Sequence, residues 1–461
     1  MILVATAAFI LRLALLPYGN HPDLITNTGW SEWIYLHGAR GFYENRVWVY
    51  DWPTQLPLIN LIYGFNYIIY GKILWIVGVI RSVLAMNNFL PGIFKYWFNF
   101  ETWFGWTYYL NTPFTVGEVI SMKLIPVLSD MLIGVALFLL GSKYANSRKA
   151  LLVSVIYLFI PYTIYLSSLW GQYDQLSALT LLLSFYFLYL VKGKVTGITR
   201  WVIIFLSAAF YFISVEVKPT AVFTAPFYIY LIIRGKPVFK DVMFSAVTAV
   251  LLFWTTTLPF SGGNPFSYTL KTIIPEVFNQ TRNVLSTQSF NFWELVSPMK
   301  QNSLSFSVVG IRSLYLGYLI LLVLNAIAIC LVYRKNDLKN ILAGLFVITG
   351  GSYMFVTGML DRYYFAGLLF FLVLAIFYKK ILPLWFAAAI LFSLNLFFSW
   401  GYPVNLQLHD VVWSDFTLVR VLSLMQVVIF LLAVRILIKD VVTGEVVKSR
   451  LHEGNYEITK K

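Results

Sequence analysis

A short polar stretch, Ser167–Leu176, separates two strongly apolar runs of the chain. It carries an indole, an amide and a carboxylate, on Trp170, Gln172 and Asp174. Polar groups between two apolar helices must meet water, a lipid headgroup or each other. A helix start satisfied by its own side chains is the structural alternative, but two polar groups beside an indole favour a site. We therefore expect this stretch to form the floor of a binding site at one face of a membrane.

Two further carboxylates follow the first apolar run. Asp23 comes directly after the turn-forming Pro22, and Asp51 comes directly before Trp52 and Pro53. Each has two interpretations that the residues leave open. It is either the N-cap of a helix or a carboxylate placed to take a proton from a substrate hydroxyl. For Asp51 the capped interfacial helix is the favoured interpretation.

Lys123 and Asp130 form a charged pair within one apolar run. They are seven residues apart, so a helix would place them on the same face, two turns from each other. A carboxylate this deep in a membrane is costly unless it is paired or faces a polar cavity. A structural ion pair with a neighbouring span is slightly favoured for Asp130. Lys123 lies nearer the outer end, where it is also placed to meet a lipid phosphate.

Two cations stand at expected helix starts on the same face as the polar stretch. Lys218 precedes a proline, which fixes its position. Arg362 is followed by Tyr363 and an apolar run. A guanidinium binds phosphate through a planar fork, which suits a lipid-linked phosphate. The alternatives are that Glu216 only neutralises Lys218 and that Arg362 forms a surface pair with its neighbour.

A long segment on this face, 259–311, adds two more candidate binding residues, Arg282 and Asn291. A connection of about fifty residues between spans is uncommon and tends to be functional.

The composition is that of a polytopic membrane protein. The chain has 461 residues, of which 59% are hydrophobic and 12% charged, whereas soluble domains carry about 25% charged residues. We expect one transmembrane domain over 1–461 and no separate soluble domain. The net charge of +14 indicates orientation in the membrane and no nucleic-acid partner. One cysteine and four histidines without close spacing predict neither disulfides nor a metal site.

Hydropathy predicts an all-α bundle of about twelve transmembrane helices. The expected spans are 1–17, 119–141, 149–167, 173–192, 200–216, 219–234, 240–259, 312–333, 339–358, 362–378, 381–400 and 417–438. The first is expected to be an uncleaved span, because no basic leader or small-residue cleavage site accompanies it.

Every second connection between these spans is rich in Lys and Arg. The positive-inside rule therefore places both termini and the tail 439–461 in the cytoplasm of a cell-membrane protein. The opposite, extracytoplasmic face receives the large first loop 18–118 and the candidate site. Within that loop Leu56–Ile80 is apolar but contains prolines and glycines. We favour helices lying on the outer surface, with a re-entrant pair as the alternative.

Taken in order along the chain, these motifs resemble the GT-C superfamily of membrane glycosyltransferases, in its mannosyltransferase-like branch that uses polyprenyl- or dolichyl-phosphate-linked sugars. The resemblance covers roughly Asp23 to Phe365, and its most specific part is Trp170-Gly171-Gln172-Tyr173-Asp174. It implies surface helices in the first loop, a carboxylate base, and no metal or other cofactor. By position, Asp23 is the best candidate base, with Asp51 next. The chain departs from the family at Leu360-Asp361, where relatives carry His-Glu.

The expected function is the transfer of a single sugar, a hexose such as mannose, from a polyprenyl-phosphate donor to an acceptor, with inversion. The acceptor would be a lipid-linked glycan, a glycolipid or a protein. The alternative is a transporter or lipid flippase without covalent chemistry. That class usually shows internal repeats, and none is visible here. An inactive scaffold of a glycosylation complex is a third possibility.

Overall fold

The computed structural model of the chain describes residues 1–19, 21–45, 53–87, 114–191, 197–235, 239–279, 284–297, 305–400 and 412–443. Within these ranges nearly all regular structure is helical, and the strands are four segments of two residues each. The expected all-α membrane class is confirmed at this level.

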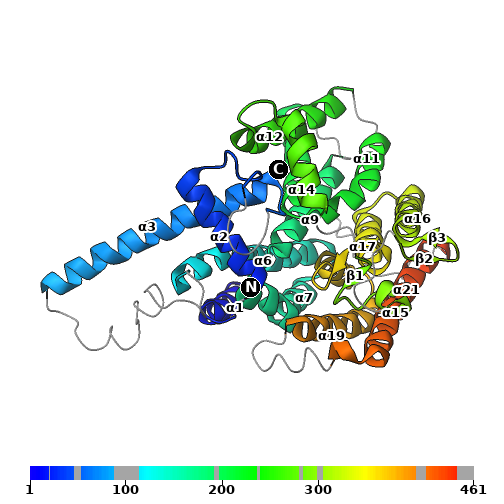
Figure 1. Cartoon of the computed structure of the whole chain (residues 1–461). Helices are drawn as coiled ribbons and strands as arrows, with labels where there is room; N and C mark the ends of the chain where they lie inside the picture. The colour runs from blue at the N-terminus through cyan, green and yellow to red at the C-terminus, as the bar shows by residue number, and fades with distance from the viewer. Residues whose placement is uncertain are drawn as a thin grey trace, which may run out of the picture.

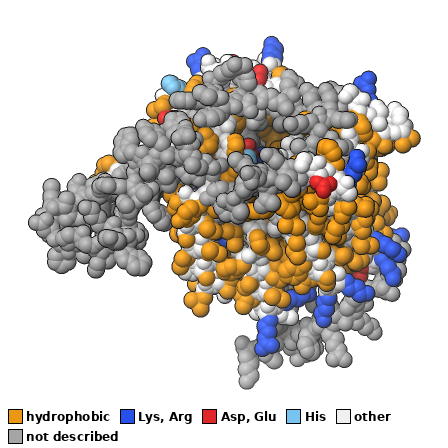
Figure 2. Space-filling view, turned by 60° about the horizontal axis from the view of Figure 1, so that its bottom comes forward, with side chains coloured by type: hydrophobic (Ala, Val, Ile, Leu, Met, Phe, Trp, Pro, Cys, Tyr) orange, Lys and Arg blue, Asp and Glu red, His pale blue; other side chains and the backbone are white. Residues whose placement is uncertain are grey.

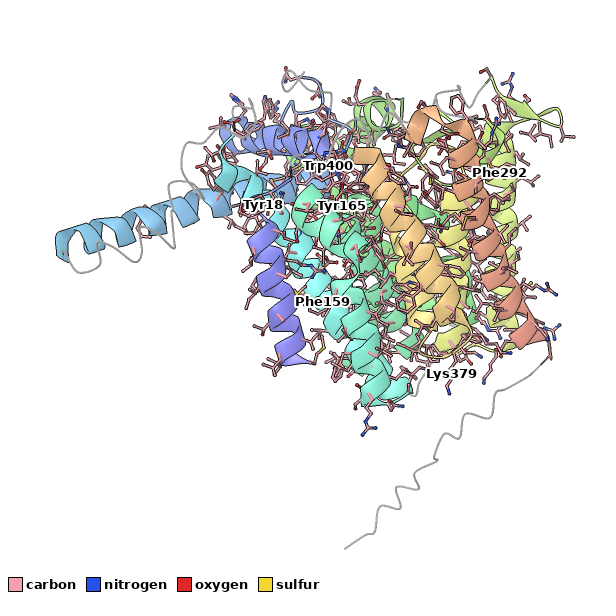
Figure 3. The ribbon with its side chains drawn as sticks, turned by 90° about the horizontal axis from the view of Figure 1, so that it is seen from below. Tyr18, Phe159, Tyr165, Phe292, Lys379 and Trp400 are labelled. Carbon is pink, nitrogen blue, oxygen red and sulfur yellow. The ribbon has the colours of Figure 1, made fainter. Side chains whose placement is uncertain are left out.

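Seven of the described helices are long and apolar enough to cross a membrane. They are α6 (Val116–Tyr144), α10 (Gly197–Val217), α12 (Phe239–Ser261), α16 (Ser313–Arg334), α17 (Leu338–Phe355), α19 (Ile381–Trp400) and α21 (Phe416–Thr443). An eighth candidate is bent by 52° and combines α7 (Ser147–Phe159) with α8 (Pro161–Ile164) and the π-helix η1 (Tyr165–Trp170). Figure 3 shows these helices running in roughly one direction as a bundle.

The remaining expected spans coincide with shorter helices. These are α1 (Ile2–Leu15), α9 (Asp174–Leu190), α18 (Phe365–Leu374) and the 3₁₀ turn η2 (Pro219–Thr224) continued by α11 (Ala225–Arg234). Each expected range therefore contains a helix. The count of twelve spans remains a prediction, because these shorter helices do not reach the length that a full crossing needs.

Two helices of the first loop, α2 (Pro22–His37) and α3 (Pro57–Asn87), lie across one end of the bundle. They pack closely, since a Cβ added at Gly64 of α3 would come within 2.7 Å of Ile34 of α2. Figures 1 and 3 show α3 running across the bundle and projecting beyond its side. The helix is continuous through Gly64 and Gly71, so the breaks expected there are absent. An unbroken transverse helix fits the surface-helix alternative better than a re-entrant pair.

The long segment between α12 and α16 folds over the same end in short elements. Its described part contains α13 (Pro265–Tyr268), η3 (Thr269–Ile273), α14 (Ile274–Asn279), β1 (Ser286–Thr287), α15 (Phe292–Val296), β2 (Ser307–Val308) and β3 (Ile311–Arg312). Strands β2 and β3 form an antiparallel pair. Strand β1 pairs in parallel with β4 (Met359–Leu360), with Thr287 opposite Leu360. This pairing holds the residues that follow β4 against the end of the bundle.

The core lies around α17 and α18, whose side chains are almost all buried. Glycines let neighbouring helices approach closely here. A Cβ at Gly367 of α18 would come within 2.8 Å of the backbone of Gly350 in α17, the close contact that small residues permit in membrane bundles. Because these central helices are tightly packed, the loop between them, which contains β4, is held on a rigid support.

The molecule has an apolar band with charged side chains at both of its ends. Figure 2 shows Lys and Arg side chains clustered below this band. Figure 3 places Lys379 at the end opposite to Tyr18 and Trp400. The transverse helices and the polar stretch between α7 and α9 therefore lie at the end away from the basic cluster, as the positive-inside pattern predicts.

Candidate functional site

The polar stretch between η1 and α9 forms a tight turn around Gly171. This glycine has φ +76° and follows Trp170, the last residue of the π-helix. The Leu166 carbonyl of that helix accepts the backbone N–H of Gln172 at 2.9 Å. A Cβ at Gly171 would come within 2.9 Å of Leu24 and 3.1 Å of Lys123. Glycine is needed both for the left-handed backbone and for this close approach. The turn brings Gln172 against Asp23 of α2 and places Asp174 at the start of α9.

Asp23 lies in the first turn of α2 and is not its N-cap. The cap is His21, whose Nδ1 accepts the backbone N–H of Asp23 at 3.1 Å. The N-cap interpretation of Asp23 is therefore wrong, since the preceding imidazole fills that role. Oδ2 of the Asp23 carboxylate accepts a hydrogen bond from Gln172 Nε2 at 3.0 Å. The same oxygen forms an ion pair with Arg362 at 2.9 Å. Its side chain is 35% exposed.

A second ion pair lies beside the first. Lys218, immediately before η2, pairs with Asp174 at 2.9 Å; the Asp174 side chain is buried and that of Lys218 is half-buried. The ammonium also lies over the Tyr363 ring, 4.6 Å from its centroid. Two cations and two carboxylates that are far apart in the sequence therefore meet at the end of the bundle opposite to Lys379.

Arg362 is the centre of this cluster. Besides Asp23, its guanidinium contacts Asp361 Oδ1 at 3.4 Å, and that same oxygen accepts the Arg362 backbone N–H at 2.9 Å. The guanidinium lies over the rings of Trp170 and Tyr363, at 5.6 and 5.7 Å. Its Nε is buried and has no partner among the described residues. One donor of the guanidinium therefore has no protein partner among the described residues.

Three aromatic rings cover the Asp23 side of the cluster. The His21 ring packs on Trp170 with centroids 4.1 Å apart and meets Trp400 edge-on at 5.4 Å. Figure 3 shows Trp400, at the end of α19, close to Tyr165 of η1. These contacts fix the imidazole and hence the start of α2.

A small cavity lies next to the Lys218–Asp174 pair. Its polar lining includes both of these side chains and the hydroxyl groups of Ser177, Thr349 and Ser352. Figure 2 shows the surface hollowed at the end above the apolar band, with charged side chains visible inside. The cavity is small, about 20 Å³, which is room for a water molecule and not for a sugar.

The surroundings change the protonation of the cluster. Burial acts to raise the pKa of Asp23, but Arg362, His21 and Lys218 together outweigh it and hold that pKa below its usual range. Burial lowers the pKa of His21 to about 4, so the imidazole is neutral at pH 7. Burial raises the pKa of Asp361 to about 6, against the pull of Arg362. Burial also lowers the pKa of Lys218, while Asp174 opposes that change.

Lys123 and Asp130 hold helices together and do not face the cluster. The Lys123 ammonium donates to the carbonyls of Leu16, Tyr18 and Gly19 at 2.7–3.0 Å. It ties the end of the first helix under the Gly171 turn.

Asp130 pairs with Arg12 of α1 at 3.2 Å and accepts the Tyr157 hydroxyl at 2.6 Å. Both members of the ion pair are fully buried, so the structural alternative for Asp130 is the one that the geometry fits.

Asn291 also has a local role. Its side chain caps α15 and donates to Ser286 and to the Tyr353 carbonyl. It supports the strand pair behind the Arg362 loop and does not enter the cluster. Asp51 and Arg282 lie outside the described residues, so their predicted roles stay predictions.

Three residues of the cluster were not among the expected site residues: His21, Asp361 and Trp400. His21 is two residues before Asp23 and Asp361 is directly before Arg362, and that proximity in the sequence is the signal that could have found them. Trp400 carries no such signal, because it reaches the site only through the packing of α19.

Searches against protein-family models and against curated proteins find no match to this chain. Among the described residues, no group of three or more His, Cys, Asp or Glu side chains is arranged to hold a metal ion.

Proposed function

We propose that the protein is an integral-membrane glycosyltransferase that moves one sugar from a polyprenyl-phosphate-linked donor to an acceptor hydroxyl. The observation that carries the proposal is the position of Asp23. It is a partly exposed carboxylate, held by Gln172 and Arg362, next to a second cation, Lys218, at the outer end of an apolar bundle. A base beside two phosphate-binding cations is the constellation that such a transfer needs.

Among the carboxylates of the cluster, Asp23 is best placed to act as the base. Asp174 and Asp361 keep only 5% and 7% of their side-chain surface exposed. Asp23 keeps 35%, and both of its strong contacts are to Oδ2. Among the described residues, its Oδ1 has one polar contact, to the neutral His21 at 3.6 Å. That oxygen is therefore the one available to an acceptor hydroxyl.

The proposed step is a single displacement. Asp23 Oδ1 takes the proton of the acceptor hydroxyl while the hydroxyl oxygen bonds to the anomeric carbon from the face opposite the phosphate. The bond between that carbon and the phosphate oxygen breaks, and its electron pair leaves with the polyprenyl phosphate. The configuration inverts. Arg362 and Lys218 stabilise the negative charge that develops on the phosphate.

The sugar is proposed to be a hexose such as mannose, and the acceptor a lipid-linked glycan, a glycolipid or a protein on the extracytoplasmic side. The apolar bundle offers the donor lipid a membrane route to the cluster. Of the aromatic rings near Asp23 and Arg362, Trp170 is buried, whereas Tyr363 and Trp400 are half-buried and leave surface on which a sugar ring can pack.

The test uses purified protein in detergent, incubated with radiolabelled polyprenyl-phosphate mannose or glucose and a lipid extract as acceptor source. Labelled product without any ion gradient supports the enzyme. Asp415→Asn serves as the control variant, because Asp415 is an exposed N-cap and Asn caps a helix equally well. Absence of product with both sugars, together with protein-dependent movement of the intact donor across vesicle membranes, would favour the transporter alternative.

A further inference from the structure

The charges around Arg362 do not balance. Its single guanidinium is shared between Asp23 at 2.9 Å and Asp361 at 3.4 Å. The neighbouring Lys218 is already matched by Asp174 at 2.9 Å. The cap His21 adds no charge, because its Nδ1 accepts a hydrogen bond from the chain. With all three carboxylates ionised, the cluster holds one more negative charge than positive.

This excess matters for an anionic ligand. A polyprenyl-phosphate sugar is a phosphodiester and brings one further negative charge. Placed against Arg362 and Lys218, it would compete with the carboxylates that these cations already hold. Like charges in a buried site repel strongly, and such sites commonly bind a proton on one carboxylate.

Asp361 is the member of the cluster best suited to take that proton. Asp174 keeps a cation of its own, and Asp23 is the more exposed carboxylate with a closer contact to Arg362. Asp361 is 7% exposed on its side chain and has the longer contact. The groups that face it are Arg362, Asp23 of α2, Tyr353 of α17, Tyr363, and Ser399 of α19. Of these, only Asp23 and Arg362 are charged near neutral pH.

We propose that Asp361 is a proton acceptor coupled to donor binding: the site takes up one proton at this carboxyl when an anionic phosphodiester binds to Arg362 and Lys218. This rests on the proposed function, because it assigns a further role within the same site. Protonated Asp361 releases its share of Arg362 to the phosphate. Asp23 stays ionised and remains available as the base.

The pH dependence follows from the direction of the linkage. Burial already raises the pKa of Asp361 to about 6, and the bound anion raises it further. At pH 5 and below the carboxyl is mostly protonated in both states, and donor affinity approaches a constant maximum. As the pH rises above 6, the free site loses the proton first. Donor affinity then falls by about tenfold per pH unit until the bound state also loses it.

The experiment is calorimetric titration of the wild-type protein with a short-chain isoprenyl phosphomannose, and separately the glucose analogue, which are phosphodiesters without a titratable proton in this range. Measuring the binding enthalpy at pH 7 in PIPES and in imidazole, two buffers without phosphate that differ in ionisation enthalpy, gives the number of protons taken up, and affinities are measured from pH 5.5 to 8.5. We expect an uptake of about 0.9 proton at pH 7 and of about 0.2 proton at pH 5.5, because these are the ionised fractions of a carboxyl whose pKa in the free site is about 6.

Asp361→Asn removes the titrating group and keeps an oxygen acceptor for the Arg362 N–H. We expect this variant to bind the probe with the same affinity at all these pH values, and more tightly than the wild type at pH 8. Asp415→Asn is the matched control and should behave as the wild type. Binding without proton uptake, or a pH dependence that persists in Asp361→Asn, overturns the inference and leaves the proposed function standing. No binding of either probe at any pH counts against the proposed function itself.

Discussion

Replacing Arg362 by Ala should produce two effects that can be measured separately. The first is on the donor. The guanidinium offers an unpartnered buried Nε and a contact to Asp23 that a phosphate can replace. A lost charge-assisted hydrogen bond costs about 1.5–3 kcal/mol, which corresponds to a donor KM or Kd about 10- to 150-fold higher. Acceptor dependence at saturating donor should change little.

The second effect is on pH dependence. Arg362 is the main charge that holds the pKa of Asp23 below its usual range, against the effect of burial. Without it that pKa rises. Activity requires ionised Asp23 and is lost as the pH falls through this pKa. The acid limb of kcat/KM should therefore move to higher pH in Arg362→Ala. Arg362→Lys should restore part of the donor affinity, because it keeps a charge but not the planar fork.

The assay is a donor titration at saturating acceptor, repeated across pH for wild type, Arg362→Ala and Arg362→Lys. Arg420→Ala is the matched control, since Arg420 is exposed on α21. Thermal melting in detergent checks that each variant is folded. A folded Arg362→Ala protein with unchanged donor dependence and an unchanged acid limb would refute the reasoning, and Arg282 would become the next candidate for the phosphate.

Asp23→Asn should reduce turnover by about 10²- to 10⁴-fold without lowering the melting temperature, and wild-type turnover would transfer the base role to Asp51. Lys218→Ala should weaken donor dependence in the same direction as the loss of Arg362 but by a smaller factor, measured in the same titration. Arg12→Leu should destabilise the protein by about 3–5 kcal/mol, because it leaves the fully buried Asp130 unpaired. Adding Asp130→Leu should recover part of that loss in the melting temperature, and purely additive effects would contradict the pairing.

Part of the site was predictable because several of its residues are close together in the sequence or stand next to a proline. Trp170, Gln172 and Asp174 stand together at a break between apolar runs, and Pro219 fixes the place of Lys218. Arg362 begins a new apolar run. Once the spans were threaded, these residues had to fall at one end of the bundle. The structure brings all of them into the cluster around Asp23.

Other assignments needed distances that the sequence does not contain. Lys123 and Asp130 resemble site residues by type and spacing. In the structure, Lys123 donates to backbone carbonyls and Asp130 pairs with Arg12. The choice between cap and free carboxylate for Asp23 depended on one hydrogen bond to His21. Each of these outcomes depends on individual contacts of about 3 Å, and a pattern of residue types does not specify such contacts.

The sequence by itself determined the class of protein, the approximate place of each helix and the charge difference between the two ends. Those properties depend on hydropathy and charge summed over short stretches of the chain, so they can be read without knowing the tertiary structure. Only the tertiary structure decided which carboxylates are matched by cations and which one stays accessible. That choice depends on side chains about 150 to 340 residues apart meeting within a few ångströms. The electrostatic energy of a carboxylate changes steeply when a cation moves by a few ångströms. The residue types in the sequence are the same whether or not the cation is that close.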